Sequence, residues 1–116
     1  MFQLEKVASV LEEITVKVPG DHGEVTEATF SVRFRVLDVD EISESIEELR
    51  SGKITDDDLF ARDVKGWEDI SDEKGKPLPF TASNLKKIIR LRWVRQGMVD
   101  AWYRVQLGRE KAAAKN

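Results

Sequence analysis

Residues 14–36 read ITVKVPGDHGEVTEATFSVRFRV, and this stretch decides the fold class. Apolar and polar side chains alternate on both sides of a break at residues 19–23, which hold one proline and two glycines. Such alternation is typical of strands with one buried face, so the stretch predicts an antiparallel hairpin. A lone hairpin is only marginally stable, so helices must cover its apolar face. The apolar positions are Ile14, Val16, Val18, Ala28, Phe30, Val32, Phe34 and Val36.

Two helices are predicted after the hairpin. Asp40 is a suitable N-cap for the first helix, and Gly52 is a suitable end. Thr55 is a suitable N-cap for the second, because three aspartates then fill its first turn, where the helix dipole favours acids. The inward positions of these helices are Ile42, Ile46 and Leu49, and then Leu59 and Phe60.

The second half of the chain is predicted to hold two more helices. Residues 64–70 fit either an extended edge strand or a loop anchored by Trp67. Thr81 is a suitable N-cap for the next helix, with Phe80 before it and Leu85 after it in position for a hydrophobic staple. Helical spacing of apolar residues predicts a last helix that ends at Gly108; these residues are Val94, Met98, Ala101, Trp102 and Val105.

The sequence therefore predicts one α+β domain over residues 1–108, an N-terminal antiparallel β-hairpin packed against three or four α-helices. Residues 109–116 are predicted to form a flexible basic tail. The first ten residues lack the apolar stretch of a signal peptide, since they include Glu5 and Lys6. No run of 18 apolar residues occurs, so we expect a soluble cytoplasmic protein without a membrane span.

The composition excludes most catalytic and metal-binding classes. The chain has no cysteine and a single histidine, His22, which excludes thiolate metal sites, cysteine nucleophiles and motifs that need two histidines. The acidic stretches that begin at Asp38 and Asp69 lack the ligand and glycine spacing of a calcium loop. No glycine-rich phosphate loop is present. We therefore expect no cofactor, no metal site and no enzymatic activity.

Charge is distributed unevenly along the chain, whose 116 residues carry a net charge of −3. Residues 1–80 hold 10 Lys and Arg against 20 Asp and Glu, whereas residues 81–116 hold 9 against 2. The basic part either binds nucleic acid, receives a protein partner, or is simply the solvated face of two helices. A pI of about 5.3 disfavours nucleic acid, because such binders are usually basic overall. The candidate partner-binding residues are Trp93, Arg95, Trp102, Tyr103 and Arg104.

The centre of the chain resembles a known family. Gly66-Trp67 is followed by residues 72–80, which read DEKGKPLPF, and then by Asn84-Leu85. These motifs, the preceding hairpin and acidic helix, and the aromatic pair Trp102-Tyr103 of the last helix are similar to those of phage tail assembly chaperones of long-tailed bacteriophages. The chain departs from the family at residues 91–97, which read LRWVRQG where members often have a Tyr-Pro-Gly-like turn.

The resemblance implies a non-enzymatic protein of the host cytoplasm that is absent from the mature virion. It implies binding to the tape measure protein, whose long helical chain is kept soluble during tail morphogenesis. The major tail tube protein is the second implied partner, recruited by an extended form made by programmed frameshifting. Self-association is left open, and no membrane partner is expected. The alternative is a small nucleic-acid-binding or regulatory protein that uses the basic C-terminal helices.

Residues 114–116 permit a slippery sequence in the gene. Ala-Lys-Asn can be encoded by GCA AAA AAC, which contains a heptamer on which both tRNAs re-pair after slipping back by one base. We expect this heptamer if a frameshifted longer product exists. Other synonymous codons in the last nine bases would remove this expectation.

Overall fold

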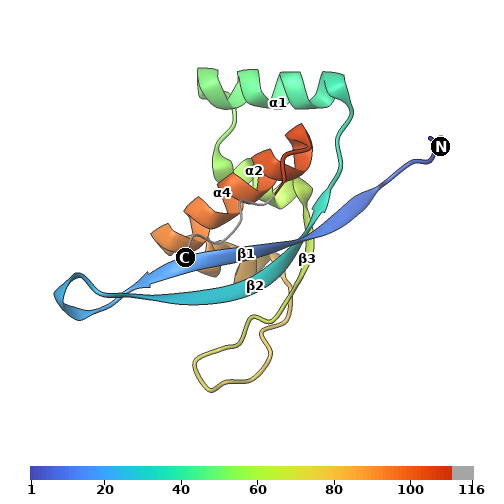
Figure 1. The fold of residues 1–116 in the computed structure, drawn as a ribbon. Coiled ribbons are helices and arrows are strands. Elements are labelled where there is room, and N and C mark those ends of the chain that lie inside the picture. Colours follow the sequence, from blue (N-terminus) through green and yellow to red (C-terminus); the bar gives the residue numbers. More distant parts are fainter. Residues whose placement is uncertain (111–116) are drawn as a thin grey trace.

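The computed structural model describes residues 1–110. Over these residues the chain forms one three-stranded antiparallel sheet and four α-helices, which confirms the predicted α+β class (Figure 1). None of these helices has the length and apolar character needed to cross a membrane. In chain order the elements are β1 (Ser9–Pro19), the 3-10 turn η1 (Asp21–Gly23), β2 (Val25–Arg35), α1 (Val39–Ser51), α2 (Asp56–Asp63), β3 (Val64–Glu68), α3 (Ala82–Ile88) and α4 (Arg92–Leu107).

The strands β1 and β2 form the predicted hairpin. Ile14 lies opposite Phe30, and the ladder runs from the Ser9–Arg35 pair to the Pro19–Val25 pair. The connecting turn has positive φ at two residues, 59° at His22 and 76° at Gly23, and glycine adopts that conformation without strain. The alternation predicted which face is buried, but the hairpin is longer than the apolar pattern indicated, because polar residues also pair at both ends.

Residues 64–68 form the edge strand β3, so the open choice for residues 64–70 is resolved in favour of a strand. β3 pairs antiparallel with residues 31–34 of β2. It does not pair with the half of the hairpin nearest the turn, which we call the turn half. The Trp67 indole N–H donates a hydrogen bond to the carbonyl of Leu78 at 2.8 Å. Its ring also meets the ring of Phe80 edge-on, with 4.9 Å between centroids. Trp67 therefore ties the segment after β3 back to the sheet.

The first helix begins two residues earlier than predicted. Asp38, not Asp40, is the N-cap: its carboxylate accepts a hydrogen bond from the N–H of Glu41 at 2.8 Å. The Glu41 carboxylate accepts in return from the Asp38 N–H at 3.4 Å, which completes a capping box. Asp40 was a wrong choice because an N-cap at residue 40 would put a serine, not a glutamate, at the third helical position.

The other predicted helix ends are confirmed. Thr55 caps α2 and Thr81 caps α3, each accepting a hydrogen bond from a backbone N–H three residues later. Gly52 and Gly108 end α1 and α4 in the left-handed conformation. The predicted tail over residues 109–116 falls mostly outside the described residues, of which Arg109 and Glu110 are exposed.

One apolar core joins the sheet to α2, α3 and α4, while α1 packs against it with half-buried side chains. α4 lies mainly across β1, and Gly97 is the point of closest approach. A Cβ atom at residue 97 would lie 2.9 Å from Ile14 Cγ2 and from Val16 Cγ1. Glycine inside this helix therefore allows α4 to rest directly on the β1 side chains.

We expect Gly97→Ala to destabilise the protein. Overpacking costs about 1–3 kcal/mol, which exceeds the ~1 kcal/mol gained by removing a helical glycine. The net loss expected in the free energy of unfolding is therefore up to about 2 kcal/mol, measured by urea denaturation. The matched control is Gln96→Ala, an exposed neighbour in the same helix, which should stay within about 0.5 kcal/mol of wild type. A more stable Gly97→Ala variant would contradict the close approach.

Candidate partner-binding surface

Trp93 lies in the first turn of α4, half-buried, beside the turn half of the hairpin. Two hollows flank its side chain, because Trp93 and Val16 line both of them. We call Trp93 and these two hollows the Trp93 surface. It exists because β3 pairs only with the other half of β2 and the helices cover the hairpin incompletely near its turn.

The smaller hollow has a volume of about 260 Å³ and a mainly apolar lining. Asp69 is the one charged residue among those that line it. Thr29 and Ser71 add two hydroxyl groups to the lining. Such a hollow suits an apolar side chain of a partner, because most of the groups around it are methyl groups and rings. Its apolar lining residues are Val16, Val18, Ala28, Phe30, Ile70, Leu78, Ile88, Leu91, Trp93 and Val94.

The larger hollow has a volume of about 420 Å³ and a more polar rim. It is bounded by β1, the start of β2 and one flank of α4, which contribute Lys17, Arg92 and Asp100 as charged groups. An apolar hollow and a more polar one thus meet at Trp93 and Val16. This arrangement matches an amphipathic helix, whose apolar row and polar flank lie side by side.

Arg95 and Arg104, two other predicted candidates, are engaged within the protein. Arg95 Nη1 lies 2.6 Å from Asp57 Oδ1 and 3.8 Å from Asp56 Oδ2, and its Nε donates to the carbonyl of Ile89. Arg104 Nε lies 3.5 Å from Glu12 Oε2. These contacts hold α4 to α2 and to β1, so both arginines act as structural ties.

Trp102 does not belong to a partner-binding surface in this structure. Its side chain is fully buried, and its indole N–H donates a hydrogen bond to Asp63 Oδ2 at 2.8 Å. Tyr103 is half-buried and meets the Trp102 ring edge-on at 5.0 Å. Helical periodicity had placed Trp102 in the inward row, and that assignment is the correct one. Of the five candidates, Trp93 is the one that lines the two hollows described above.

Asp63 is the centre of a charged network that sequence reasoning missed. Its fully buried carboxylate accepts hydrogen bonds from Arg62 Nε at 2.7 Å and from Arg35 Nη2 at 3.1 Å, besides the Trp102 indole. The same arginines reach α1, since Arg35 pairs with Glu41 at 3.1 Å and Arg62 donates to Ser45 Oγ at 2.9 Å. We call these six residues the Asp63 network; it joins β2, α1, α2 and α4.

The pKa of Asp63 is lowered from its ordinary value. Burial, the largest single influence, raises this pKa, but hydrogen bonds from Arg62, Trp102 and Arg35 and the charge of Arg62 outweigh it. The hydrogen bond to Asp63 likewise raises the pKa of Arg62. Both shifts favour the charged forms, so the network is a stabilised ion pair. It does not lie on the Trp93 surface.

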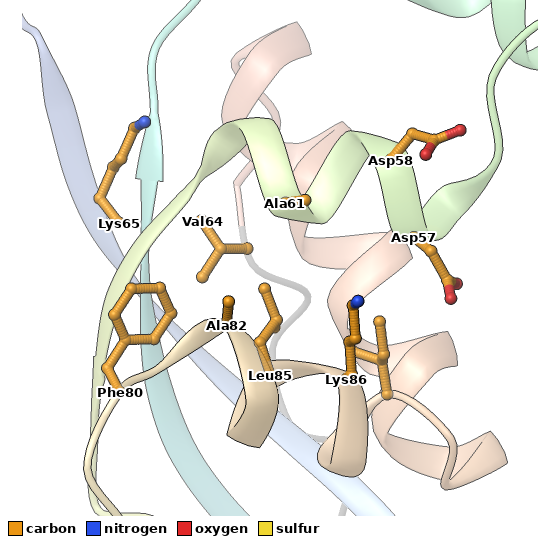
Figure 2. A pocket seen from close by; sticks show the side chains of 10 residues that line it. Asp57, Asp58, Ala61, Val64, Lys65, Phe80, Ala82, Leu85 and Lys86 are labelled. Carbon is orange, nitrogen blue, oxygen red and sulfur yellow. The ribbon is translucent and has the colours of Figure 1, made fainter.

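A second surface lies between α2 and α3, and Figure 2 shows its lining. We call it the α2–α3 groove; its volume is about 520 Å³. Asp57 and Asp58 lie at one end, and Lys65 and Phe80 lie at the other (Figure 2). The remaining lining residues are Ala61, Val64, Ala82, Leu85, Lys86 and Ile89. The predicted staple residues Phe80 and Leu85 thus both face this groove.

The described residues offer no group of three or more His, Asp or Glu side chains that could hold a metal ion. His22 lies exposed in the hairpin turn. Four basic residues between the end of α3 and the start of α4 are also exposed: Lys86, Lys87, Arg90 and Arg92. No family model, curated protein or solved structure matches this chain. Any functional conclusion therefore depends on the surfaces described above.

We expect Asp63→Asn to lower the free energy of unfolding by about 3 kcal/mol at pH 7, because it leaves two guanidinium groups without their shared carboxylate. Urea denaturation measures the change. Asp100→Asn is the matched control, since Asp100 is an exposed acid on α4 and its loss should change stability by less than about 0.5 kcal/mol.

The pH dependence of this difference follows from the lowered pKa. Asp63 stabilises the fold above its unfolded pKa of about 3.9, and this contribution is lost as pH falls through the lower folded pKa. The difference in the free energy of unfolding between wild type and Asp63→Asn should therefore be largest at pH 7 and shrink toward zero below pH 4. A gap that stays constant down to pH 2 would contradict the role of the ionised carboxylate.

Proposed function

We propose that the protein is a phage tail assembly chaperone that binds the tape measure protein through the Trp93 surface. The single observation that carries the proposal is that Trp93 lines both an apolar hollow and a more polar one. A tape measure protein is long and helical, and each exposed amphipathic helix has an apolar row that must be shielded from other copies. Trp93 is a suitable anchor, because aromatic residues at the centre of an interface contribute most to affinity.

The resemblance of residues 66–85 to the family supports the same proposal. Trp67, Phe80 and Asn84, three of the residues that carry it, have structural contacts here: Asn84 donates a hydrogen bond to the Pro79 carbonyl at 2.9 Å. This segment includes Leu78, Ile70 and Asp69, which form one wall of the apolar hollow. The motif therefore shapes the proposed binding surface.

The proposal extends to location and further partners. We infer that the protein acts in the host cytoplasm before the virion is complete and that it is absent from the mature virion. An extended form, if frameshifting produces one, would recruit the major tail tube protein. The bases that encode residues 114–116 and the neighbouring genes test these parts: we expect a slippery heptamer and a very long tape measure gene downstream.

The decisive test is co-expression with the tape measure protein encoded in the same genome. We expect the tape measure protein to be soluble with the wild-type chain and insoluble alone. Trp93→Ala should weaken the complex about 30-fold, as expected for the loss of an anchor worth roughly 2 kcal/mol. Isothermal titration with a soluble helical fragment of the tape measure protein measures the change.

The matched control is Val39→Ala, which removes an exposed apolar side chain from α1, outside the Trp93 surface. This variant should bind as the wild type does. An insoluble tape measure protein in the presence of the wild-type chain would overturn the function. Unchanged binding by a folded Trp93→Ala protein would leave the function standing and overturn the surface.

Nucleic-acid binding is the second candidate, favoured by the exposed cluster of Lys86, Lys87, Arg90 and Arg92. Arg95 and Arg104 do not add to this cluster, because they pair with acids. If these four residues contacted phosphates, the logarithm of the binding constant would fall with that of salt at a slope of about −3 to −4. Such a slope on duplex or single-stranded DNA would support this candidate, and its absence would exclude the role.

A further inference from the structure

The segment Met1–Ala8, which we call the arm, holds apolar side chains in solvent. Phe2 is 86% exposed and Leu4 is 90% exposed. The arm lies outside the helices and strands, and Figure 1 shows it continuing the line of β1 away from the helices. Its base is tied to the sheet, because the carbonyl of Ala8 accepts a hydrogen bond from the N–H of Val36 at 2.9 Å. The exposed side chains are thus presented outward.

The arm has the side-chain pattern of a strand with one apolar face. In an extended chain, residues at every second position point to the same side. Phe2, Leu4 and Lys6 therefore share one side, and Gln3 and Glu5 share the other. The first side carries two large apolar groups followed by one cation.

The α2–α3 groove has the complementary pattern. Its floor is apolar, and one end carries acids (Figure 2). The first turn of α2 carries three carboxylates: Asp56 and Asp57 pair with Arg95, and Asp58 accepts hydrogen bonds from Thr55. Lys86 also lines the groove, so three carboxylates against Arg95 and Lys86 leave one negative charge in excess. The opposite end carries Lys65 beside Phe80. A bound strand is therefore favoured when its cation lies at the acidic end.

The two patterns also match in length. From Phe2 to Lys6 an extended chain spans about 13 Å. From Asp57 to Val64 the backbone of α2 rises by about 10 Å, and Phe80 lies beyond Val64 (Figure 2). With Lys6 at the acids, Phe2 and Leu4 therefore lie over the apolar floor.

We propose that the arm of one copy binds in the α2–α3 groove of a second copy. The arm's own groove is disfavoured, because the hydrogen bond at Ala8 directs the arm along β1 and away from α2 and α3. The arm can reach the groove of a second copy without turning back toward its own helices. Since this assembly uses the α2–α3 groove and not the Trp93 surface, it does not rest on the proposed function.

Cysteine cross-linking tests this contact directly, because the chain has no cysteine of its own. In the variant with Leu4→Cys and Ala82→Cys, mild oxidation should give a species of twice the 13.2 kDa mass, seen by non-reducing electrophoresis. The control pairs Leu4→Cys with Val39→Cys, which is exposed on α1 outside the groove, and should remain uncross-linked. A disulfide formed within one chain, or none at all, would overturn the proposal.

Complementation between two variants provides a second test that needs no cross-link. Phe2→Ser with Leu4→Ser disables the arm, and Ala61→Glu blocks the groove at an exposed position of α2. Each variant alone should sediment as a monomer, whereas the wild type should form dimers or larger assemblies as its concentration rises. An equimolar mixture should regain dimers, because one intact arm then meets one intact groove.

The remaining outcomes also decide the matter. A wild-type chain that stays monomeric at all accessible concentrations would overturn the proposal. So would variants that associate as the wild type does, since another surface would then be responsible. Binding of the wild type to the tape measure fragment is measured separately, so a failed arm contact and a failed chaperone role are distinguishable.

Discussion

The buried carboxylate of Asp63 is the constraint on which the arrangement of the helices depends. It lies at the end of α2, accepts hydrogen bonds from Arg35 of β2 and from Trp102 of α4, and acts through Arg62 on α1. An ion in the interior is costly unless its hydrogen bonds are made, and here groups from β2, α2 and α4 make them. Apolar packing is less directional than this, so the network selects the positions of the helices on the sheet.

The length of the hairpin decides where the protein can bind partners. β1 and β2 each have 11 residues, whereas β3 has 5 and pairs with one end of β2. The core therefore gathers at that end, and the turn half is covered mainly by the start of α4. Trp93 partly fills the uncovered space and leaves a hollow on each side. A long hairpin on a small core thus exposes apolar area that suits an amphipathic partner.

Local patterns predicted most of the fold, and the errors have physical causes. The hairpin, the caps at Thr55 and Thr81 and the glycine ends depend on residues near one another in the chain. The cap of α1 was predicted at Asp40, whereas the reciprocal hydrogen bonds with Glu41 make Asp38 the cap. The candidate site was predicted less well, since only Trp93 lines a hollow and the α2–α3 groove was not foreseen.

The sequence by itself determined the α+β class, the buried face of the hairpin and most helix ends, because these follow from periodicity and from contacts within a few residues. Only the tertiary structure decided which charges and aromatic rings face inward. The bond from Trp102 to Asp63 joins residues 39 positions apart, and the bond from Arg104 to the Glu13 carbonyl joins residues 91 apart. No local pattern encodes such pairs, because the packing of the elements determines which side chains are buried and which residues they contact.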